Sequence, residues 1–160
     1  MTLRRILRDS HPALRERAKP VPKVNHVILQ LLDDMVETMR EANGAGLAAP
    51  QIGIAKRIIV VDAGDDKLLQ LINPVILMTE GSCVDVEGCL SVPGVYGEVS
   101  RAARITFAAL DRAGQEVKLT LEGWPARILQ HEIDHLDGIL FIDKTIRLVD
   151  PSELKREEAK

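Results

Sequence analysis

The amino-acid sequence predicts an α+β fold, with antiparallel sheets around a central helix that carries a His-Glu-x-x-His metal motif. Two observations predict this class. Apolar residues recur at helical spacing in two segments, one after Asn25 and one after Trp124. Between these segments, short apolar and β-branched runs alternate with turn residues, as is typical of antiparallel strands.

The first helix is expected to begin after Asn25, whose side chain can cap it. Before it, the two prolines in residues 19–22 exclude a helix and favour an extended chain. Gly44 is expected to end the helix. Its apolar residues recur every three or four positions, so that one face packs against a core. They are Ile28, Leu31, Leu32, Met35, Met39 and Ala42.

Four strands are expected, at residues 57–62, 68–78, 104–110 and 115–122. The first two are continuous apolar runs, which is typical of buried strands. Asn73-Pro74 marks a bend or an edge in the second strand. The last two flank Asp111-Arg-Ala-Gly114, a sequence that favours a hairpin turn.

Trp124-Pro125 is expected to begin the second helix, with Pro125 at its first helical position and Gly138 just past its end. Residues 139–143 are expected to form a last short strand. Residues 1–160 are then expected to form a single domain, since a chain of this length has no room for a second core. A short polar helix of mixed charge is expected from about residue 150.

Composition argues against several classes of partner. The formal net charge of −3 does not favour a general nucleic-acid-binding surface, and one Trp, one Tyr and two Phe leave little to stack on bases. No apolar run approaches the roughly 20 residues that span a bilayer. The N-terminus does not resemble a secretory signal, and two cysteines make no disulfide framework. We therefore expect a cytoplasmic protein with no membrane contact and no sequence-specific nucleic-acid binding.

The segment His131-Glu132-Ile133-Asp134-His135 places two imidazoles four residues apart on one helix. Residues at this spacing share a face, so both rings can reach one metal ion. Glu132 is offset by about 100°, which lets it touch a water on that ion without binding the ion itself. A pattern this short also occurs by chance, so the other motifs decide its meaning.

Two further segments carry chemically useful groups. Residues 87–91, Glu-Gly-Cys-Leu-Ser, offer a thiolate, and residues 44–51, Gly-Ala-Gly-Leu-Ala-Ala-Pro-Gln, offer a turn of small residues that ends in an amide donor. Alone, a cysteine is usually a small buried apolar residue, and a Gly-Ala turn is usually a helix cap. With the helix they supply two nitrogens, a sulfur, a base and an amide, and packing does not explain that set.

In these three segments the chain resembles the peptide deformylases. The family patterns G-x-G-x-A-A-x-Q, E-G-C-x-S and Q-H-E-x-D-H occur here at residues 44–51, 87–91 and 130–135, in the family order. The resemblance extends to about Asp143. It implies a metal-dependent hydrolase that removes the formyl group from the N-terminal formylmethionine of newly made polypeptides and releases formate.

The resemblance implies a role for each matched residue. Cys89, His131 and His135 would hold a divalent metal ion and leave a fourth position for water. Glu132 would move the protons. The side chain of Gln51 and the backbone N–H of Leu90 would stabilise charge on the formyl oxygen. Substrate contacts are expected from Gly46, Leu47, Glu87, Gly88, Trp124 and Ile128, of which Trp124 and Ile128 would be walls of the methionine pocket.

The metal and the partners are less constrained by the residues. The resemblance favours Fe²⁺, with Zn²⁺, Ni²⁺ or Co²⁺ as alternatives, because thiolate and imidazole ligands suit several of these ions. In bacterial members a basic C-terminal helix docks on the ribosome. Here the basic residues of the tail are offset by Glu153, Glu157 and Glu158, which gives little support for ribosome docking.

Some positions depart from the family or have no assigned role. Tyr96 stands where some members carry Arg, and Arg127 stands where an apolar residue is common. Arg127 either points outward or alters the substrate entrance. Asp134 is expected to form a structural salt bridge, and Cys83 matches no motif.

Two alternatives stay open. A general HExxH zinc peptidase would take a third ligand after His135, where no further His occurs and only residues such as Asp143 or Glu153 are conceivable. A structural Cys2His2 site would add Cys83 to the three ligands. Its cysteines would be further apart than the usual spacing of about two to four residues, and Glu132 and Gln51 would have no function.

Overall fold

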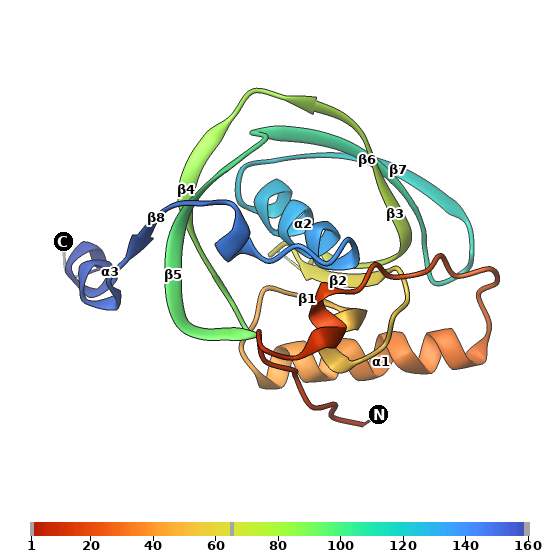
Figure 1. The fold of residues 1–160 in the computed structure, drawn as a ribbon. Helices are drawn as coiled ribbons and strands as arrows, with labels where there is room; N and C mark the ends of the chain where they lie inside the picture. Colours follow the sequence, from red (N-terminus) through yellow and green to blue (C-terminus); the bar gives the residue numbers. More distant parts are fainter. Residues whose placement is uncertain (1, 65, 159–160) are drawn as a thin grey trace.

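The chain folds into two antiparallel sheets and a small number of helices, which confirms the predicted α+β class (Figure 1). The structure is a computed structural model that describes residues 2–64 and 66–158. The five-stranded sheet has the order β1 (Gly46–Ala48), β2 (Ile58–Asp62), β3 (Leu68–Glu80), β6 (Arg104–Leu110) and β7 (Glu116–Glu122). The three-stranded sheet has the order β4 (Cys83–Cys89), β5 (Val92–Arg101) and β8 (Thr145–Val149).

The helix α2 (Gly123–Leu136) lies between the two sheets, whereas α1 (His26–Glu41) lies outside β1 and β2 (Figure 1). On the α2 side, Leu129 and Leu136 are fully buried in a cluster with Phe107 of β6 and other sheet residues. On the α1 side, a second cluster joins α1 to the opposite face of β1 and β2. The two faces of the large sheet therefore each hold one helix.

The start of α1 follows the expected capping. The Asn25 side chain accepts a hydrogen bond from the Ile28 N–H at 3.1 Å. The helix ends at Glu41, and the Gly44 N–H still bonds to the Met39 carbonyl at 2.9 Å. The chain therefore leaves α1 directly into the Gly-Ala turn that leads to β1.

The bend expected at Asn73-Pro74 is present as an irregularity in the pairing of β3 with β6. Asn73 has a φ of 53°, and its side chain bonds both to the N–H of Val21 at 2.8 Å and to its carbonyl at 2.9 Å. The same asparagine therefore sets the bend and anchors the extended segment around Pro20.

The expected strand at residues 139–143 is wrong. Phe141–Asp143 is instead a short 3-10 turn (η3), and the strand β8 begins only at Thr145. The Asp143 side chain accepts a hydrogen bond from the Leu140 N–H at 3.0 Å, which closes the turn. Phe141 is buried in a cluster with Leu14, so these apolar residues pack into the core from a turn and not from a strand.

The hairpin formed by β4 and β5 is absent from the sequence expectations. The second helix also begins earlier than expected, at Gly123, so Pro125 lies in its first turn but not at its first position. Gly138 follows the end of α2 with a φ of 74°, and a Cβ there would lie 2.5 Å from the Arg15 carbonyl oxygen. Only glycine fits this approach of two chain segments.

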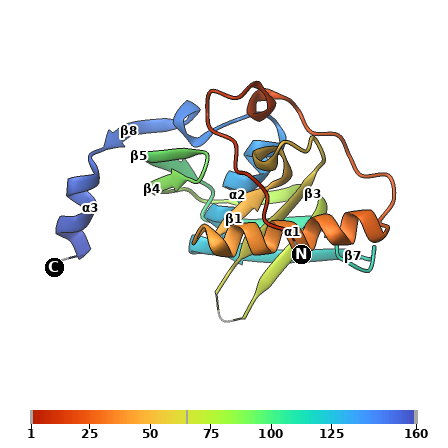
Figure 2. The same ribbon diagram turned by 90° about the horizontal axis from the view of Figure 1, so that it is seen from below.

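The described part of the chain ends with α3 (Pro151–Glu158), which projects from the body of the protein beyond β8, the edge strand of the smaller sheet (Figure 2). This is the region where a polar helix is expected. The structure does not describe the side chains of α3 from residue 155 onward, so the expected mixed charge of this helix lies outside the described part of the chain. Within the described residues, the search for a helix long and apolar enough to cross a bilayer finds no candidate.

Candidate active site

Cys89, His131 and His135 come together between β4 and α2, and their ligand atoms all lie within 4.8 Å of one another. Cys89 ends β4, and the two histidines lie one turn apart on α2. The sulfur of Cys89 is 3.3 Å from Nε2 of His135. The imidazole rings meet edge to face with centroids 5.0 Å apart. Two distant segments thus converge on one point, as the motifs predict.

This donor set fits a divalent metal ion. One thiolate and two imidazoles are ligands that suit zinc and iron, and both histidines are buried. Nδ1 of His135 is buried without a hydrogen-bond partner, while its Nε2 faces the sulfur. Cys83 is exposed and lies outside this group, so the structure does not assemble the Cys2His2 alternative.

Glu87 holds His131 in place. Its Oε1 lies 2.9 Å from Nδ1 of His131, which leaves Nε2 of that ring free for an ion. Arg101 donates two hydrogen bonds of 2.9 Å to the same carboxylate. Burial alone would raise the pKa of Glu87, but its bonds to Arg101 and His131 lower it to about 2. The group is therefore a carboxylate at any working pH.

The imidazoles of His131 and His135 have pKa values that are shifted in opposite directions. For His131, burial opposes protonation, but the contact with Cys89 and the charges of Glu132 and Glu87 together raise its pKa to about 10. For His135, burial lowers the pKa, and the positive charge of His131 lowers it further. A cation that binds here must displace a proton, so its affinity increases with pH.

Asp134 makes the expected salt bridge. Its carboxylate pairs with Arg101 and with Lys144 at 3.0 Å. Arg101 is therefore fixed between two carboxylates, Glu87 on one side and Asp134 on the other. The role of Arg101 carries no motif signal in the sequence, because it lies on β5, far from the helix in the chain.

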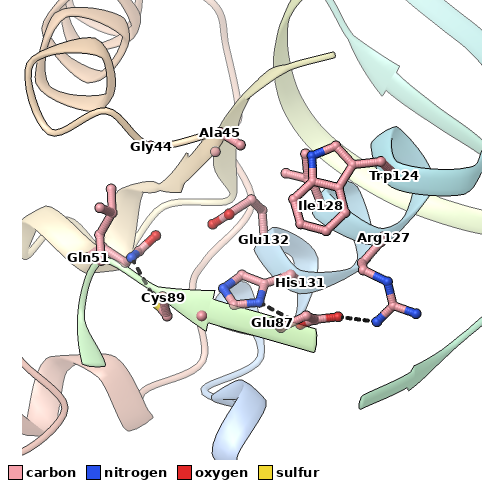
Figure 3. Close-up of a pocket in the computed structure, with 13 residues that line it drawn as sticks. Gly44, Ala45, Gln51, Glu87, Cys89, Trp124, Arg127, Ile128, His131 and Glu132 are labelled. Carbon is pink, nitrogen blue, oxygen red and sulfur yellow. Dashed lines mark hydrogen bonds and ion pairs between the residues drawn. The ribbon is translucent and has the colours of Figure 1, made fainter. Parts of the chain in front are cut away.

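Glu132 is buried beside the group formed by Cys89, His131 and His135, and its Oε1 has no hydrogen-bond partner. Figure 3 shows its carboxylate pointing into the cavity between α2 and the Gly44–Ala45 turn. Burial raises the pKa of Glu132 to about 7, and the charge of Glu87 adds to this effect, whereas that of His131 opposes it. A carboxyl group with such a pKa can accept and return a proton near neutral pH.

The side chain of Gln51 lies on the other side of Cys89 from His131 (Figure 3). It lies in a 3-10 turn (η2, Ala49–Ile52), and its Oε1 accepts a hydrogen bond from the Ala48 N–H at 2.9 Å. Its Nε2 donates to Ser91 Oγ at 3.1 Å and lies 3.6 Å from Cys89 Sγ. These bonds orient the amide N–H group toward the sulfur (Figure 3).

A cavity of about 150 Å³ opens beside these residues. Its lining includes most of the expected site residues together with some that the sequence did not indicate. The lining residues are Gly44, Ala45, Gly46, Gln51, Glu87, Gly88, Cys89, Leu90, Trp124, Arg127, Ile128, His131 and Glu132. Leu47 is not among them, since its side chain is fully buried in the cluster under α1. Gly44 and Ala45 were not among the expected contacts, whereas for Arg127 a place at the substrate entrance was one of two expected alternatives.

Tyr96 and Arg127, the two positions that depart from the family pattern, both contact residues of the site. The ring of Tyr96 covers Gly88, where a Cβ would lie 2.8 Å from the ring. Arg127 is buried and donates to Glu87 Oε2 at 2.6 Å, so the alternative in which it points outward is wrong. Arg127 is one of the lining residues of the cavity, and Figure 3 shows its guanidinium group directed toward Glu87.

Comparison with known proteins matches the polypeptide deformylase family model over residues 3–150. The peptide deformylase of Halothermothrix orenii is 54% identical over 149 residues, covering 92% of this chain and 97% of that protein. That of Caldicellulosiruptor bescii is 51% identical over 160 residues, covering 100% of this chain and 96% of that protein.

The fold matches as well. The crystal structure of peptide deformylase from Thermotoga maritima superposes with a TM-score of 0.88 at 42% identity, covering 91% of this chain and 99% of that one. The chain therefore belongs to the polypeptide deformylase family, the metal-dependent hydrolases that remove the formyl group from the N-terminal methionine of nascent polypeptides.

Proposed function

We propose that Cys89, His131 and His135 hold one divalent metal ion in this deformylase, with α2 as the central helix of the metal motif. The convergence of a sulfur and two ring nitrogens beside a buried, unpartnered carboxylate supports this proposal. Fe²⁺ is the first choice, with Zn²⁺, Ni²⁺ and Co²⁺ as alternatives. When bound, the ion supplies Lewis acidity that polarises the formyl oxygen and makes water a stronger acid.

Glu132 is the general base and acid in this proposal. Its carboxylate accepts the proton of the attacking water and later delivers that proton to the amine that leaves as the new N-terminus. Its buried position and its pKa of about 7 support the assignment, because both protonation states are accessible near neutral pH.

Gln51 and Leu90 stabilise the charge that develops on the formyl oxygen. The Gln51 amide is held by Ala48 and Ser91, so it is oriented before the substrate arrives. Leu90 lines the same cavity and would contribute its backbone N–H. Donors fixed in advance in a buried site are effective because they need no reorganisation during the reaction.

The formylated methionine occupies the cavity along α2. Trp124 and Ile128 form walls for its side chain, and a mainly apolar cavity suits a thioether. The backbones of Gly46 and Leu47 bind the peptide on one side, and Glu87 and Gly88 border it on the other. For Leu47 only the backbone is offered, because its side chain is in the core.

A formate-release assay on a formyl-Met peptide tests this assignment, run anaerobically with Fe²⁺ and separately with Zn²⁺. Glu132→Gln should keep the metal content of the parent protein and lose about 10²–10⁴-fold in turnover. Retained turnover would show that another group is the base. A Met peptide without the formyl group serves as the control, since its hydrolysis would support the general peptidase instead.

The remaining proposals follow from the substrate. We infer a single catalytic domain over residues 1–160 that acts in the cytoplasm, where nascent polypeptides are made. Ribosome docking stays a prediction with little support, because Lys155, Arg156 and Lys160 are offset by acidic neighbours in the sequence and their side chains are outside the described ones.

A further inference from the structure

Arg127 is an arginine that the fold holds in one position. Its Nη1 donates to Glu87 Oε2 at 2.6 Å and to the Val99 carbonyl at 2.9 Å. Its Nη2 donates to the Cys83 carbonyl at 2.7 Å. The residue is only 5% exposed. Acceptors on β4 and β5 therefore fix the guanidinium, and the side chain cannot swing away without leaving buried polar groups unpaired.

The position of Arg127 relative to the chemistry follows from the helix. His131 lies four residues further along α2, and residues four apart share a face at a distance of about one turn, roughly 6 Å. Gln51 and Cys89 lie at one end of the cavity, and Trp124 and Arg127 lie at the other (Figure 3). With the formyl group at the first end, as proposed above, the side chain on the α-carbon of the formylated residue would extend along α2 toward Trp124 and Arg127.

A second cavity of about 280 Å³ borders the start of α2. It shares Trp124 and Arg127 with the first cavity, and its remaining lining comes from the start of β4, the turn after β5 and the start of α2. Trp124 is 53% exposed, whereas Arg127 is buried and bonded. Arg127 is therefore the fixed part of the wall that separates the two cavities.

We propose that Arg127 is a specificity-determining residue that closes the inner end of the side-chain pocket and limits the length of the first side chain. This inference rests on the proposed binding of formylmethionine in the first cavity. Shortening Arg127 joins the two cavities, so that side chains longer than methionine gain space that the parent protein denies them.

The test uses formyl-X-Ala-Ser peptides in which X is norvaline, methionine, 2-aminooctanoic acid or 2-aminodecanoic acid. In the parent protein kcat/KM should fall sharply beyond the length of methionine. In Arg127→Ala the ratio of kcat/KM for 2-aminooctanoic acid to that for methionine should rise at least tenfold, since one methylene in an apolar pocket is worth about 10–200-fold.

Arg101→Ala is the matched control. Arg101 is also 5% exposed and also bonds to Glu87, but it lines neither cavity. If Arg127 acts only through Glu87, both variants lower kcat/KM for every peptide by a common factor, and the proposal is wrong. If Arg127 closes the pocket, only the Arg127 variant changes the dependence on length. Should Arg127→Ala not fold, Arg127→Gln, which is shorter but still polar, replaces it.

A binding measurement makes the test independent of turnover. Trp124 is the only tryptophan of the chain and forms a wall of the pocket, so its fluorescence reports occupancy. Titration with the unreactive N-acetyl-X-Ala-Ser peptides should show the same change in length preference. If the parent protein released no formate, the proposed function would fail, but this titration would still decide the role of Arg127. An unchanged length preference in Arg127→Ala would overturn the inference.

Discussion

The backbone of Gly46 lies directly against the side chain of Glu132. A Cβ atom at Gly46 would be 2.6 Å from Oε2 of Glu132 and 2.9 Å from its Cγ. The same atom would be 2.9 Å from Cγ2 of Ile128, so the side chains of both Glu132 and Ile128 pack closely against the Gly46 backbone. The first glycine-rich motif therefore fixes the position of the proposed base.

Gly46→Ala should lower kcat about 10²-fold while the metal content stays that of the parent protein, because the added methyl group displaces Glu132 from its place. Gly44→Ala is the matched control. There the methyl group would meet the tip of the Leu90 side chain at 2.6 Å, and a flexible tip can turn away. Steady-state formate release and metal analysis check this. Equal losses in the two variants would contradict the positioning role of Gly46.

Glu87→Gln should weaken metal affinity about 10–100-fold, since the amide replaces the carboxylate that orients His131 and makes it a stronger ligand. Competition with a chelator, followed by metal analysis, measures the change. Glu98→Gln is a suitable control, because Glu98 pairs with Arg147 away from the metal-ligand group. An unchanged affinity in Glu87→Gln would mean that the hydrogen bond alone, without the charge, holds the ring.

Asp34→Asn should lower the free energy of unfolding at pH 7 by about 1–2 kcal/mol. Asp34 on α1 accepts bonds from the Thr2 N–H, from Gln30 and from Arg4, which tie the N-terminal segment to the helix. Burial alone would raise the pKa of Asp34, but these bonds lower it. Its contribution is therefore complete above the ordinary pKa of about 4 and is lost as the pH falls through the lower pKa of the folded state.

Urea denaturation at pH 7 and at pH 3 measures this contribution. The difference between Asp34→Asn and the parent protein should shrink at the lower pH. Asp33→Asn is the neighbouring control: Asp33 pairs with Arg112 at 2.8 Å, but both side chains are 38% exposed, so its loss should cost at most about 0.5 kcal/mol. A pH-independent effect of Asp34→Asn would exclude the charge as its cause.

The sequence predicted correctly those structural features that neighbouring residues in the chain determine. The Asn25 cap and the hairpin at residues 111–114 are both present, because each depends on neighbours in the chain. The hairpin of β4 and β5 was not predicted, since glycines and charges interrupt the apolar pattern there. Its strands are held by pairing with each other and with β8, and a local pattern does not show such pairing.

The same division applies to the site. The motifs predicted that Cys89, His131 and His135 would meet, and the structure brings them together. An ion pair between Glu87 and an arginine was conceivable from the sequence, but the motifs did not indicate that Arg101 and Arg127 both bind Glu87. A buried arginine and an exposed one look alike in a sequence. Only the packing of β5 against α2 shows which carboxylate each arginine neutralises.

The pH dependence of turnover follows from the burial of Glu132. Burial raises its pKa to about 7, so below that pH the carboxyl group holds its proton and cannot serve as a base. We therefore expect kcat/KM to rise with pH and to level off above a midpoint at or below about 7, because a cation held by the neighbouring ligands favours the carboxylate.

Profiles of kcat/KM against pH for the parent protein and for Glu132→Gln, measured from pH 5 to pH 9, check this. The residual activity of the variant should lack this rise. If the variant keeps the same midpoint, the titration belongs to another group, and Glu132 is not the base whose ionisation limits the reaction.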